Sequence, residues 1–425
     1  MTIASLNGKT VCILGFGREG KAMLEALEAY APQAIITIAD ANASLTHERH
    51  RVRAGPQYLE GLDEYDVVVK SPGIFPHEAL CSLGPTITNS TQIFFDSITH
   101  TGALTIGVTG SKGKSTTTSL IHAMLTQGGR KSILAGNIGE PAIQYVDKAN
   151  AETIFVLELS SYQLMNLCVS PRIAVITSFF PEHLDYHGSL EAYKDAKKNI
   201  TRFQSEEDCV FYPYGSKACE DIARASAGKK YSFRPADSPV AIEDTALLGE
   251  HNLSNIAGAF RVARSIGIEE EACVRALKAF RGLPHRLQAL GTYHDIQWVD
   301  DAISTTPEST VAALKALGTN VGTIILGGQD RGVDFTVLAN ELKQYSPLVI
   351  ILFPGSGPRI RKAIEESGHT SARFFEAESM NAAVAIAKRE TTRGMICLLS
   401  TASPSYGMFK NFEEKGDAFQ ACLRN

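Results

Sequence analysis

The sequence lacks the features typical of membrane, secreted and nucleic-acid-binding proteins. No apolar run approaches the roughly 20 residues that span a bilayer, and the stretch MTIASLNGKTVCIL has no basic region followed by an apolar core and a cleavage site. A net charge of -5 provides no basic field for nucleic acid or anionic lipid. We therefore expect a cytoplasmic protein that neither binds nucleic acid nor inserts into a membrane.

The sequence also has no C-x-x-C pair, no zinc-like cysteine spacing, no internal repeat and no low-complexity tract. The eight cysteines are scattered, and we expect reduced, mostly buried thiols. They are Cys12, Cys81, Cys168, Cys209, Cys219, Cys273, Cys397 and Cys422.

Short β-branched runs alternate with helical patterns along the 425 residues. The runs are TVCILG, AIITIAD, DVVVKS, LTIGVTG, TIFVLELS, RIAVITS, GTIILGG, LVIILF and MICLLS. Such alternation predicts parallel sheets in α/β domains, with helices after Lys114, over residues 190–203 and over residues 252–266. At about 150 residues per domain, the length predicts roughly three domains.

Two breaks in the pattern predict the domain boundaries. One lies near residues 97–103, before a fresh strand, and the other lies at Gly282-Leu283-Pro284, where a helix stops. The predicted domains are a Rossmann-like domain at 1–97, a P-loop nucleotide-binding domain at 98–283 and a second Rossmann-like domain at 284–425.

A first glycine-rich turn, Gly15-Phe16-Gly17-Arg18-Glu19-Gly20, connects a strand to a helix. Glycines in this position let a backbone approach a diphosphate, and Asp40 at the end of the next strand can accept hydrogen bonds from a ribose. A tight turn without a ligand and a nicotinamide site are the alternatives. A domain of about 97 residues fits a mononucleotide or UDP-sugar better than a dinucleotide.

A second glycine-rich turn gives a stronger signal, because the strand LTIGVTG leads into Gly110-Ser111-Lys112-Gly113 and then a helix that begins with Lys114-Ser115-Thr116. This is a P-loop variant of the form T-G-x-x-G-K-[ST]. Backbone N–H groups of the turn and helix N-terminus bind phosphate oxygens, and Lys114 reaches the β- and γ-phosphates. Ser115 or Thr116 can supply a magnesium ligand.

The P-loop resembles the ATP site shared by Mur ligases and folylpolyglutamate synthases, and further motifs extend the resemblance over nearly the whole chain. In order they are TGSKGKST, GNIG, LELSSYQL, HLDYHGSLEAYKDAK, HNLSN, GLPHR and FKNFEEKG. A folylpolyglutamate synthase should lack the N-terminal nucleotide domain, so this domain favours the Mur branch that adds glutamate to UDP-N-acetylmuramoyl-L-alanine in peptidoglycan synthesis.

The resemblance implies ATP-dependent, ADP-forming amide synthesis through an acyl phosphate, with two Mg²⁺ ions. Glu158, at the end of an apolar strand, and His183 are the implied metal ligands together with Ser115; a core glutamate and a structural histidine are the alternatives. Lys197, in the pattern Y-x-x-A-K, is implied to be carbamylated near the metal, although a surface lysine remains possible from the sequence.

The same resemblance assigns the three domains to UDP-substrate, ATP and glutamate binding. For the nucleotide it implies adenine recognition by Asn252 and Asn255, for which helix capping is the alternative. His285, Arg286 and Asp301 are expected to close over ATP from the C-terminal domain, with Arg286 near the phosphates and Asp301 near the ribose. This arrangement implies domain closure before chemistry. For the UDP-linked substrate it implies Gly15, Phe16, Arg18, Glu19, Asp40, Ser71, Pro72, Gly73, Asn137, Ser160, Gln163 and His183.

The acceptor pocket is where the sequence departs from the family pattern. A usual lysine is replaced by Ile303, and a second one by Arg331, which clamps a carboxylate in bidentate fashion. Thr305, Ser405 and Phe412 keep positions expected to hold the amino acid. We expect D-glutamate, with L-glutamate as the main alternative and a non-catalytic nucleotide-binding role as a further one. A monomer is expected.

Overall fold

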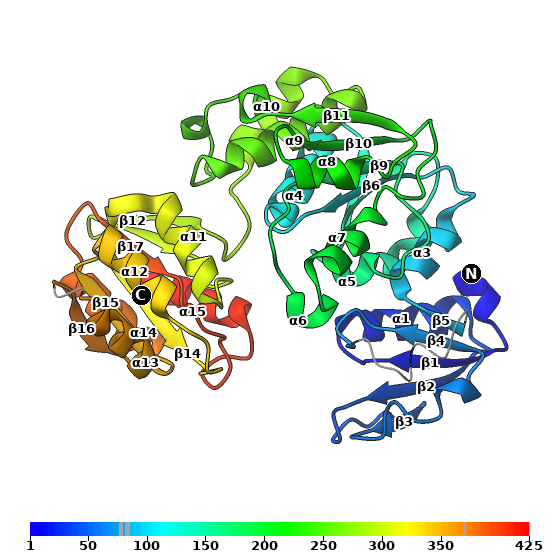
Figure 1. Cartoon of the computed structure of the whole chain (residues 1–425), viewed down its shortest axis with the longest axis horizontal. Coiled ribbons are helices and arrows are strands. Elements are labelled where there is room, and N and C mark those ends of the chain that lie inside the picture. The colour runs from blue at the N-terminus through cyan, green and yellow to red at the C-terminus, as the bar shows by residue number, and fades with distance from the viewer. Residues whose placement is uncertain (76–79, 81–85, 369–370, 425) are drawn as a thin grey trace. The chain divides into compact units, whose positions relative to one another are not determined.

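The computed structural model describes residues 1–75, 80, 86–368 and 371–424. The chain divides into two compact units (Figure 1). The first comprises Met1–Pro239 with Ser254–Leu277, and the second Val240–Leu253 with Lys278–Asn425. In these described stretches, no helix has both the length and the apolar character needed to cross a membrane.

The first unit begins with a parallel sheet of five strands. In spatial order they are β3 (Arg51–Ala54), β2 (Ile35–Asp40), β1 (Thr10–Leu14), β4 (Val67–Lys70) and β5 (Ile87–Thr88). Alternate residues of a strand point to opposite faces, so Val11 and Ile13 pack with helices α1 (Arg18–Tyr30) and α3 (Ser90–Ile98), whereas Cys12 packs on the other face. Short 3-10 helices lie at η1 (Ile3–Leu6) and η2 (Leu62–Glu64).

The second sheet of this unit is also parallel and has six strands. In spatial order they are β11 (Lys229–Phe233), β10 (Cys209–Pro213), β9 (Ile173–Ile176), β6 (Leu104–Thr109), β8 (Thr153–Glu158) and β7 (Lys131–Gly136). Its helices are α4 (Lys114–Gln127), η4 (Ala142–Lys148), α5 (Ser161–Leu164), α6 (Leu184–His187), α7 (Leu190–Lys198), α8 (Lys217–Ala223), η5 (Pro235–Asp237), α9 (His251–Ser265) and α10 (Glu270–Ala279). One apolar core joins Phe155 and Leu157 of this sheet to Phe94 of α3, so the two sheets form one unit.

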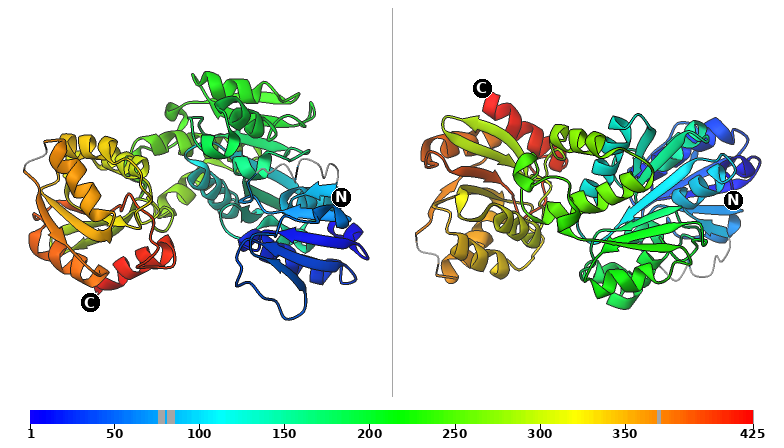
Figure 2. Two further views of the ribbon diagram at one scale, coloured as in Figure 1. Left: turned by 60° about the horizontal axis from the view of Figure 1, so that its bottom comes forward. Right: turned by 90° about the horizontal axis from the view of Figure 1, so that it is seen from above.

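The second unit is built on a six-stranded sheet with helices on both faces (Figures 1 and 2). The strand order is β12 (Gln288–Tyr293), β13 (Ile296–Asp300), β17 (Ile396–Leu399), β14 (Val321–Gly328), β15 (Val349–Gly355) and β16 (Arg373–Glu376). The helices are η6 (Ile242–Asp244), α11 (Pro307–Leu317), η7 (Gly318–Asn320), α12 (Thr336–Tyr345), α13 (Gly357–Glu366), α14 (Met380–Glu390) and α15 (Phe412–Arg424).

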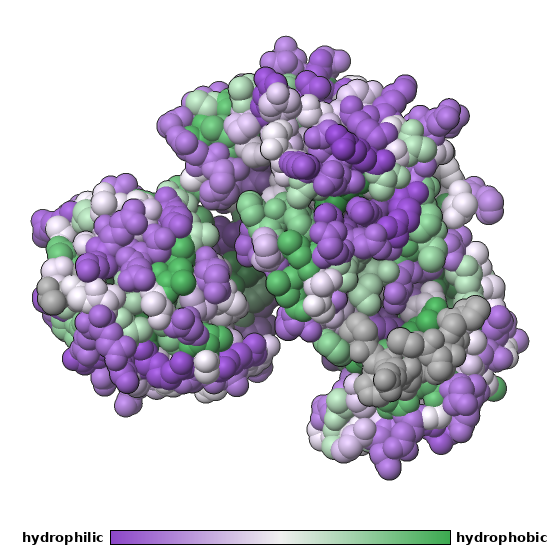
Figure 3. Space-filling view, viewed as in Figure 1, coloured by the Kyte–Doolittle hydropathy of each residue, from purple (hydrophilic) through white to green (hydrophobic). Residues whose placement is uncertain are grey.

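Alternation along the central strands explains the two helical layers of this unit. Ile324 and Leu326 pack with α11, α12 and α13, while Ile325 between them packs with α14 and α15. The viewed surface of this unit in Figure 3 is mainly hydrophilic, with isolated hydrophobic residues. Most apolar residues of this α/β unit therefore lie in its two cores, one on each face of the sheet.

The predicted strands are confirmed, because each of the nine β-branched runs contains one: β1, β2, β4, β6, β8, β9, β14, β15 and β17. These nine strands pair parallel with their neighbours, and an antiparallel pairing joins β12 to β13, neither of which was predicted. Strands such as β12 and β16 were not predicted because their sequences, QALGTY and RFFE, are short or polar and partly exposed.

The predicted helix over 190–203 is too long, since α7 ends at Lys198. The side-chain amide of Asn199 donates to the carbonyl oxygen of Leu164 at 2.9 Å, a tertiary contact that holds the following turn. The cysteines are free thiols where they are described, with Cys12, Cys219, Cys273 and Cys397 buried and Cys168 exposed. Cys81 lies outside the described residues. The boundaries at 97/98 and 283/284 stay predictions.

Candidate functional site

The candidate site of the first unit lies where neighbouring parallel strands end. β6 runs between β9 and β8, and β8 pairs with β7, so that Val108 and Gly136 both lie opposite Glu158. In a parallel sheet the carboxyl ends of the strands lie along one edge, where ligands usually bind. The phosphate loop, Glu158 and Asn137 therefore converge at this edge.

The phosphate loop has the backbone that its glycines predict. Gly110 has φ of 155°, and a Cβ there would lie 2.0 Å from Oγ1 of Thr177. Gly113 is the N-cap of α4 with φ of 85°, a left-handed conformation that glycine adopts without a steric cost. The hydroxyl of Ser111 lies 3.0 Å from that of Tyr193, which helps to anchor the loop. Of the two candidate metal-binding hydroxyls, Ser115 is half-buried and Thr116 is buried.

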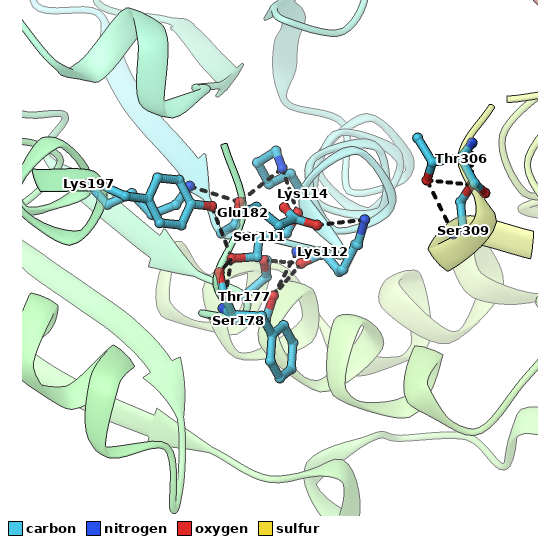
Figure 4. A network of polar contacts seen from close by, with 12 residues as sticks. Ser111, Lys112, Lys114, Thr177, Ser178, Glu182, Lys197, Thr306 and Ser309 are labelled. Carbon is cyan, nitrogen blue, oxygen red and sulfur yellow. Dashed lines mark hydrogen bonds and ion pairs between the residues drawn. The ribbon is translucent and has the colours of Figure 1, made fainter. Parts of the chain in front are cut away.

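Two lysines from different helices reach the same carbonyl oxygen of this loop (Figure 4). Nζ of Lys114 and Nζ of Lys197 each donate to the carbonyl oxygen of Gly110 at 2.9 Å. Lys197 is only 1% exposed, so burial, and to a smaller extent the neighbouring Lys114, lower the pKa of Lys197 well below its ordinary value. Burial therefore favours the neutral amine of Lys197 over its ammonium form.

Glu158 provides an oxygen that fits a metal ion. Its side chain is 1% exposed; Oε1 accepts from the side-chain amide of Asn137 at 2.7 Å, and Oε2 has no hydrogen-bond partner among the described residues. A buried carboxylate oxygen without a partner is costly unless a cation compensates it. Within the described stretches, no cluster of three or more His, Cys, Asp or Glu side chains could hold a metal ion.

His183 forms the N-cap of the one-turn helix α6 and has φ of 56°. Its ring lies 5.0 Å from the ring of Tyr162 on α5 and 6.1 Å from that of Tyr193 on α7, measured between centroids. The hydroxyl of Tyr193 also lies 3.0 Å from that of Ser111, so the turn lies beside the phosphate loop. The structure thus brings together Lys114, Lys197 and His183 from three separate motifs.

A second part of the site is a cavity of about 290 Å³ between the first glycine turn and the end of β7. It is lined by Gly15, Gly17, Arg18, Glu19, Asp40, Ser71, Pro72, Gly73, Ile74, Asn137 and Gln163. Nearly all the residues predicted for the UDP-linked substrate therefore share one cavity. Phe16, Ser160 and His183 are not among the lining residues. Phe16 donates its backbone N–H to Asp40, and Ser160 bonds to Gln163.

Hydrogen bonds fix the side chains of this cavity. The guanidinium of Arg18 donates to the carbonyl oxygens of Gly139 at 3.0 Å and Asn137 at 2.9 Å, which joins α1 to the turn after β7. Glu19 accepts from Gln163 at 3.0 Å, and burial raises the pKa of the Glu19 carboxyl above its ordinary value. The cavity is consequently preorganised by contacts between the two sheets of the first unit.

Lys70 and Tyr186 are cavity neighbours that the sequence did not reveal. Lys70 ends β4, is 6% exposed, and donates to the hydroxyl of Tyr186 at 3.2 Å. Burial lowers the pKa of Lys70 to about 8. The only available signal was the polar residue that ends the apolar run DVVVK, next to Ser71.

Asn255 lies against the phosphate loop. A Cβ on Gly113 would lie 2.3 Å from Oδ1 of Asn255, and Oγ1 of Thr117 donates to the same oxygen at 3.3 Å. Asn252 is also buried, and its side-chain amide donates to the carbonyl oxygen of Leu248 at 2.9 Å.

The second unit contains a buried polar cluster at the end of β13. Nδ1 of His285 lies 2.8 Å from Oδ2 of Asp300, and this hydrogen bond raises the pKa of His285. Asp301 accepts from the backbone N–H of Leu287 at 3.1 Å, and burial raises the pKa of its carboxyl to about 6. Nε of Arg286 is buried without a partner among the described residues.

Lys415 belongs to this cluster and was not predicted. Its side chain is 1% exposed and donates to the hydroxyl of Thr401, and burial lowers its pKa to about 8. The charges of Asp300 and Asp301 act on it in the opposite direction. Lys415 lies in the motif FKNFEEKG, but its burial depends on the docking of α15.

The predicted acceptor residues come from loops that contact one another in the second unit. The backbone N–H of Gln329 donates to the carbonyl oxygen of Pro404 at 2.9 Å, and the guanidinium carbon of Arg331 lies 5.9 Å from the ring centroid of Tyr406. The hydroxyl oxygen of Ser405 is buried with no partner in the described part of the chain.

The other two acceptor candidates lie close to these loops. Thr305 follows Ser304, whose carbonyl oxygen accepts from the backbone N–H of Ala402 at 3.1 Å. Phe412 begins α15, with its ring centroid 6.3 Å from that of His285.

Comparison with known families gives two matches that together cover more than half of the chain. Residues 108–237 match the Mur ligase middle domain, and residues 285–402 match the Mur ligase glutamate ligase domain. Among curated relatives, UDP-N-acetylmuramoylalanine--D-glutamate ligase of Streptococcus agalactiae serotype Ia is 33% identical over 447 residues, which cover 98% of this chain and 97% of the relative. The enzyme of the same name from Streptococcus sanguinis is 33% identical over 455 residues, with 99% and 98% covered.

Two solved structures from Thermotoga maritima share the fold. UDP-N-acetylmuramate-alanine ligase MurC superposes with a TM-score of 0.61 at 17% identity and covers 98% of this chain and 99% of that one. The MurF ligase in complex with ADP superposes with a TM-score of 0.60 at 14% identity and covers 100% and 97%. At such identities the likeness concerns the fold alone.

Proposed function

The chain belongs to the Mur ligase family of ATP-dependent, ADP-forming amide ligases of peptidoglycan synthesis, and from this premise we propose that it joins D-glutamate to UDP-N-acetylmuramoyl-L-alanine. The supporting observation is the cavity that contains Arg18, Asp40 and Asn137, because Asn137 also bonds to Glu158 beside the phosphate loop. A ligand held in this cavity has its acyl end directed toward the phosphate loop.

The proposed reaction has two steps. A carboxylate oxygen of the alanine attacks the γ-phosphorus of ATP, ADP leaves, and an acyl phosphate results. The neutral amine of glutamate then attacks the acyl carbon, expels phosphate and releases one proton, which leaves the amide bond. Lys114 and the N–H groups at the start of α4 would hold the phosphates, so that positioning and charge neutralisation supply most of the catalysis.

We propose Ser115, Glu158, His183 and Lys197 as the residues that hold two Mg²⁺ ions. When bound, Mg²⁺ neutralises phosphate charge and orients the phosphoryl group. The neutral amine of Lys197 can attack CO₂, forming an N–C bond and losing a proton, and the resulting carbamate would present a carboxylate-like group at the site. The buried position and lowered pKa of Lys197 support this modification.

For the nucleotide we propose that Asn252 and Asn255 contact adenine, while His285, Arg286 and Asp301 approach the phosphates and ribose after domain closure. This closure assumes the predicted division into domains 1–97, 98–283 and 284–425, with UDP-substrate, ATP and glutamate sites. A cytoplasmic monomer stays part of the same prediction.

For the acceptor we propose Thr305, Arg331, Ser405 and Phe412. The buried hydroxyl oxygen of Ser405, which has no partner among the described residues, supports a role in binding a polar group. L-glutamate is the second candidate, because Arg331 and Ile303 replace the lysines of the usual D-glutamate pattern.

The decisive experiment measures phosphate release with ATP, Mg²⁺ and UDP-N-acetylmuramoyl-L-alanine, in parallel reactions with D-glutamate, L-glutamate and no amino acid. We expect release with D-glutamate and a product heavier by one glutamate residue. Release with L-glutamate alone would transfer the proposal to the second candidate. ATP binding without release in any reaction would indicate a non-catalytic nucleotide-binding protein.

A further inference from the structure

One tyrosine hydroxyl connects the turn that carries His183 to the wall of the substrate cavity. The phenolic oxygen of Tyr186, on α6, lies 2.9 Å from the carbonyl oxygen of Pro72 and 2.8 Å from that of Ile74. Both residues line the cavity. Nζ of Lys70 donates to the same phenolic oxygen at 3.2 Å.

The chemistry of a phenol makes this contact specific. The hydroxyl has one hydrogen, which it can donate to either carbonyl oxygen, and its lone pairs accept from Lys70. Burial raises the pKa of Tyr186 to about 12, so the hydroxyl keeps its hydrogen at neutral pH. These three contacts therefore tie α6 to the loop after β4.

The ring of Tyr186 holds the other side of the turn. It lies 4.2 Å from the ring of Tyr162 and 5.5 Å from that of Phe75 between centroids. His187, the next residue, stacks on Tyr162 and bonds to the hydroxyl of Ser161 at 3.0 Å. The turn is thus fixed to α5 by its rings and to the cavity wall by one hydroxyl.

Because α6 is only four residues long, its position depends on contacts such as that of the Tyr186 hydroxyl. A four-residue helix has few internal hydrogen bonds, so its position depends on tertiary contacts. His183 precedes it in a left-handed conformation, which a non-glycine residue adopts at a cost of about 1 kcal/mol and keeps only when its surroundings enforce it.

We propose that Tyr186 is a positioning residue whose hydroxyl couples occupancy of the substrate cavity to the placement of His183. A ligand that contacts the loop Ser71–Ile74 fixes the carbonyl oxygens of Pro72 and Ile74, which accept from the Tyr186 hydroxyl. The fixed hydroxyl then holds the turn that carries His183. The inference rests on the proposed function, since the ligand of the cavity and the metal role of His183 are themselves proposals.

Hydrogen–deuterium exchange of Tyr186→Phe tests the link, because this variant removes one oxygen and keeps the ring. The matched control is Tyr162→Phe, which removes the hydroxyl of the adjacent ring, for which the described residues provide no hydrogen bond. The reporters are the amides of Ser71 and Ile74 in the loop and of His187 and Gly188 in the turn, all hydrogen-bonded. UDP is the probe.

In the wild type and in the control, UDP should slow exchange in both the loop and the turn. In Tyr186→Phe, UDP should slow exchange in the loop alone. Protection of the turn by UDP in this variant would overturn the proposal. If UDP slows exchange in neither segment of the wild type, the assignment of this cavity to the UDP-linked substrate is wrong. In that case the link is tested with the ligand-free proteins. The amides of the loop and of the turn should exchange faster in Tyr186→Phe than in Tyr162→Phe. Equal exchange rates would refute the link.

A magnesium titration supplies a second readout that a general loss of stability would not change. The Mg²⁺ concentration for half-maximal phosphate release should rise about 10-fold in Tyr186→Phe, as is typical when a residue that orients a metal ligand is removed. The control should keep the wild-type value. An unchanged Mg²⁺ requirement with a lowered melting temperature would assign Tyr186 a structural role only.

Discussion

Nδ2 of Asn137 donates a hydrogen bond of 2.7 Å to Oε1 of Glu158. Asn137 lines the cavity proposed for the UDP-linked substrate, and Glu158 ends a strand beside the phosphate loop. The bond occupies one carboxylate oxygen and leaves Oε2 available to a cation. A single amide thus sets both the cavity wall and the orientation of the proposed metal ligand.

Asn137→Ala should raise the Mg²⁺ concentration for half-maximal phosphate release by about 10- to 100-fold, because an unsupported carboxylate binds metal less well. The comparison is a magnesium titration against Asn150→Ala, an exposed asparagine with local hydrogen bonds. A normal magnesium requirement in Asn137→Ala would show that Glu158 needs no such support.

Lys114→Ala should reduce ATP-dependent ligation by about 100- to 1000-fold while the fold stays intact, since the ammonium group is expected to stabilise charge on the transferred phosphate. Product formation and circular dichroism are the measurements. Lys131→Ala, at the exposed start of β7, is the matched control. Near-normal turnover in Lys114→Ala would refute the P-loop assignment.

Lys197→Ala should lose activity, and a short carboxylate such as formate should restore part of it by replacing the carbamate oxygens. The physical reason is the burial of the Lys197 amine, which lowers its pKa and so favours the neutral form that reacts with CO₂. Removal of CO₂ and bicarbonate should lower wild-type activity as well. Lys198→Ala, one residue further along α7, should behave as the wild type in all these assays. Failure of rescue together with an unmodified mass at Lys197 would leave it an ordinary lysine.

Arg331→Ala should raise the KM for glutamate far more than the KM for ATP, because a carboxylate that loses its cation typically costs about 2 to 5 kcal/mol. Steady-state kinetics with each substrate varied in turn measures the two constants. Arg361→Ala, which removes an exposed arginine paired with Glu365, is the control. An equal rise in both KM values would move Arg331 to the nucleotide site.

Lys415→Met should change how stability depends on pH. The pKa of Lys415 is about 8 in the folded protein and 10.5 in its ordinary state, so between these values the unfolded chain binds more protons. The contribution of this group to the free energy of unfolding therefore rises with pH. Between about pH 8 and pH 10, the free energy of unfolding of the wild type should rise by about 2 kcal/mol relative to that of Lys415→Met. Urea unfolding at both pH values measures this difference. A constant difference would mean that the ammonium group is better solvated than its burial indicates.

Much of the site followed from local sequence. The phosphate loop and the first glycine turn follow apolar strands directly, and Glu158 is the last residue of one. Strand ends are where ligands bind in parallel sheets. Most of the residues predicted for the UDP-linked substrate line one cavity, although Arg18 and Asn137 are far apart in the chain. Their grouping was expected from the resemblance to the Mur family, and their contacts come from the structure.

The sequence by itself determined the α/β class, nine of the strands and the family, because these depend on short patterns of apolar residues and glycines. Only the tertiary structure decided the antiparallel β12, the end of α7 at Lys198, and the roles of Lys70, Tyr186 and Lys415. A lysine has the same sequence signature at the surface and in a core. Its burial, and with it its pKa, depends on which distant segment packs over it, and no local pattern encodes that contact.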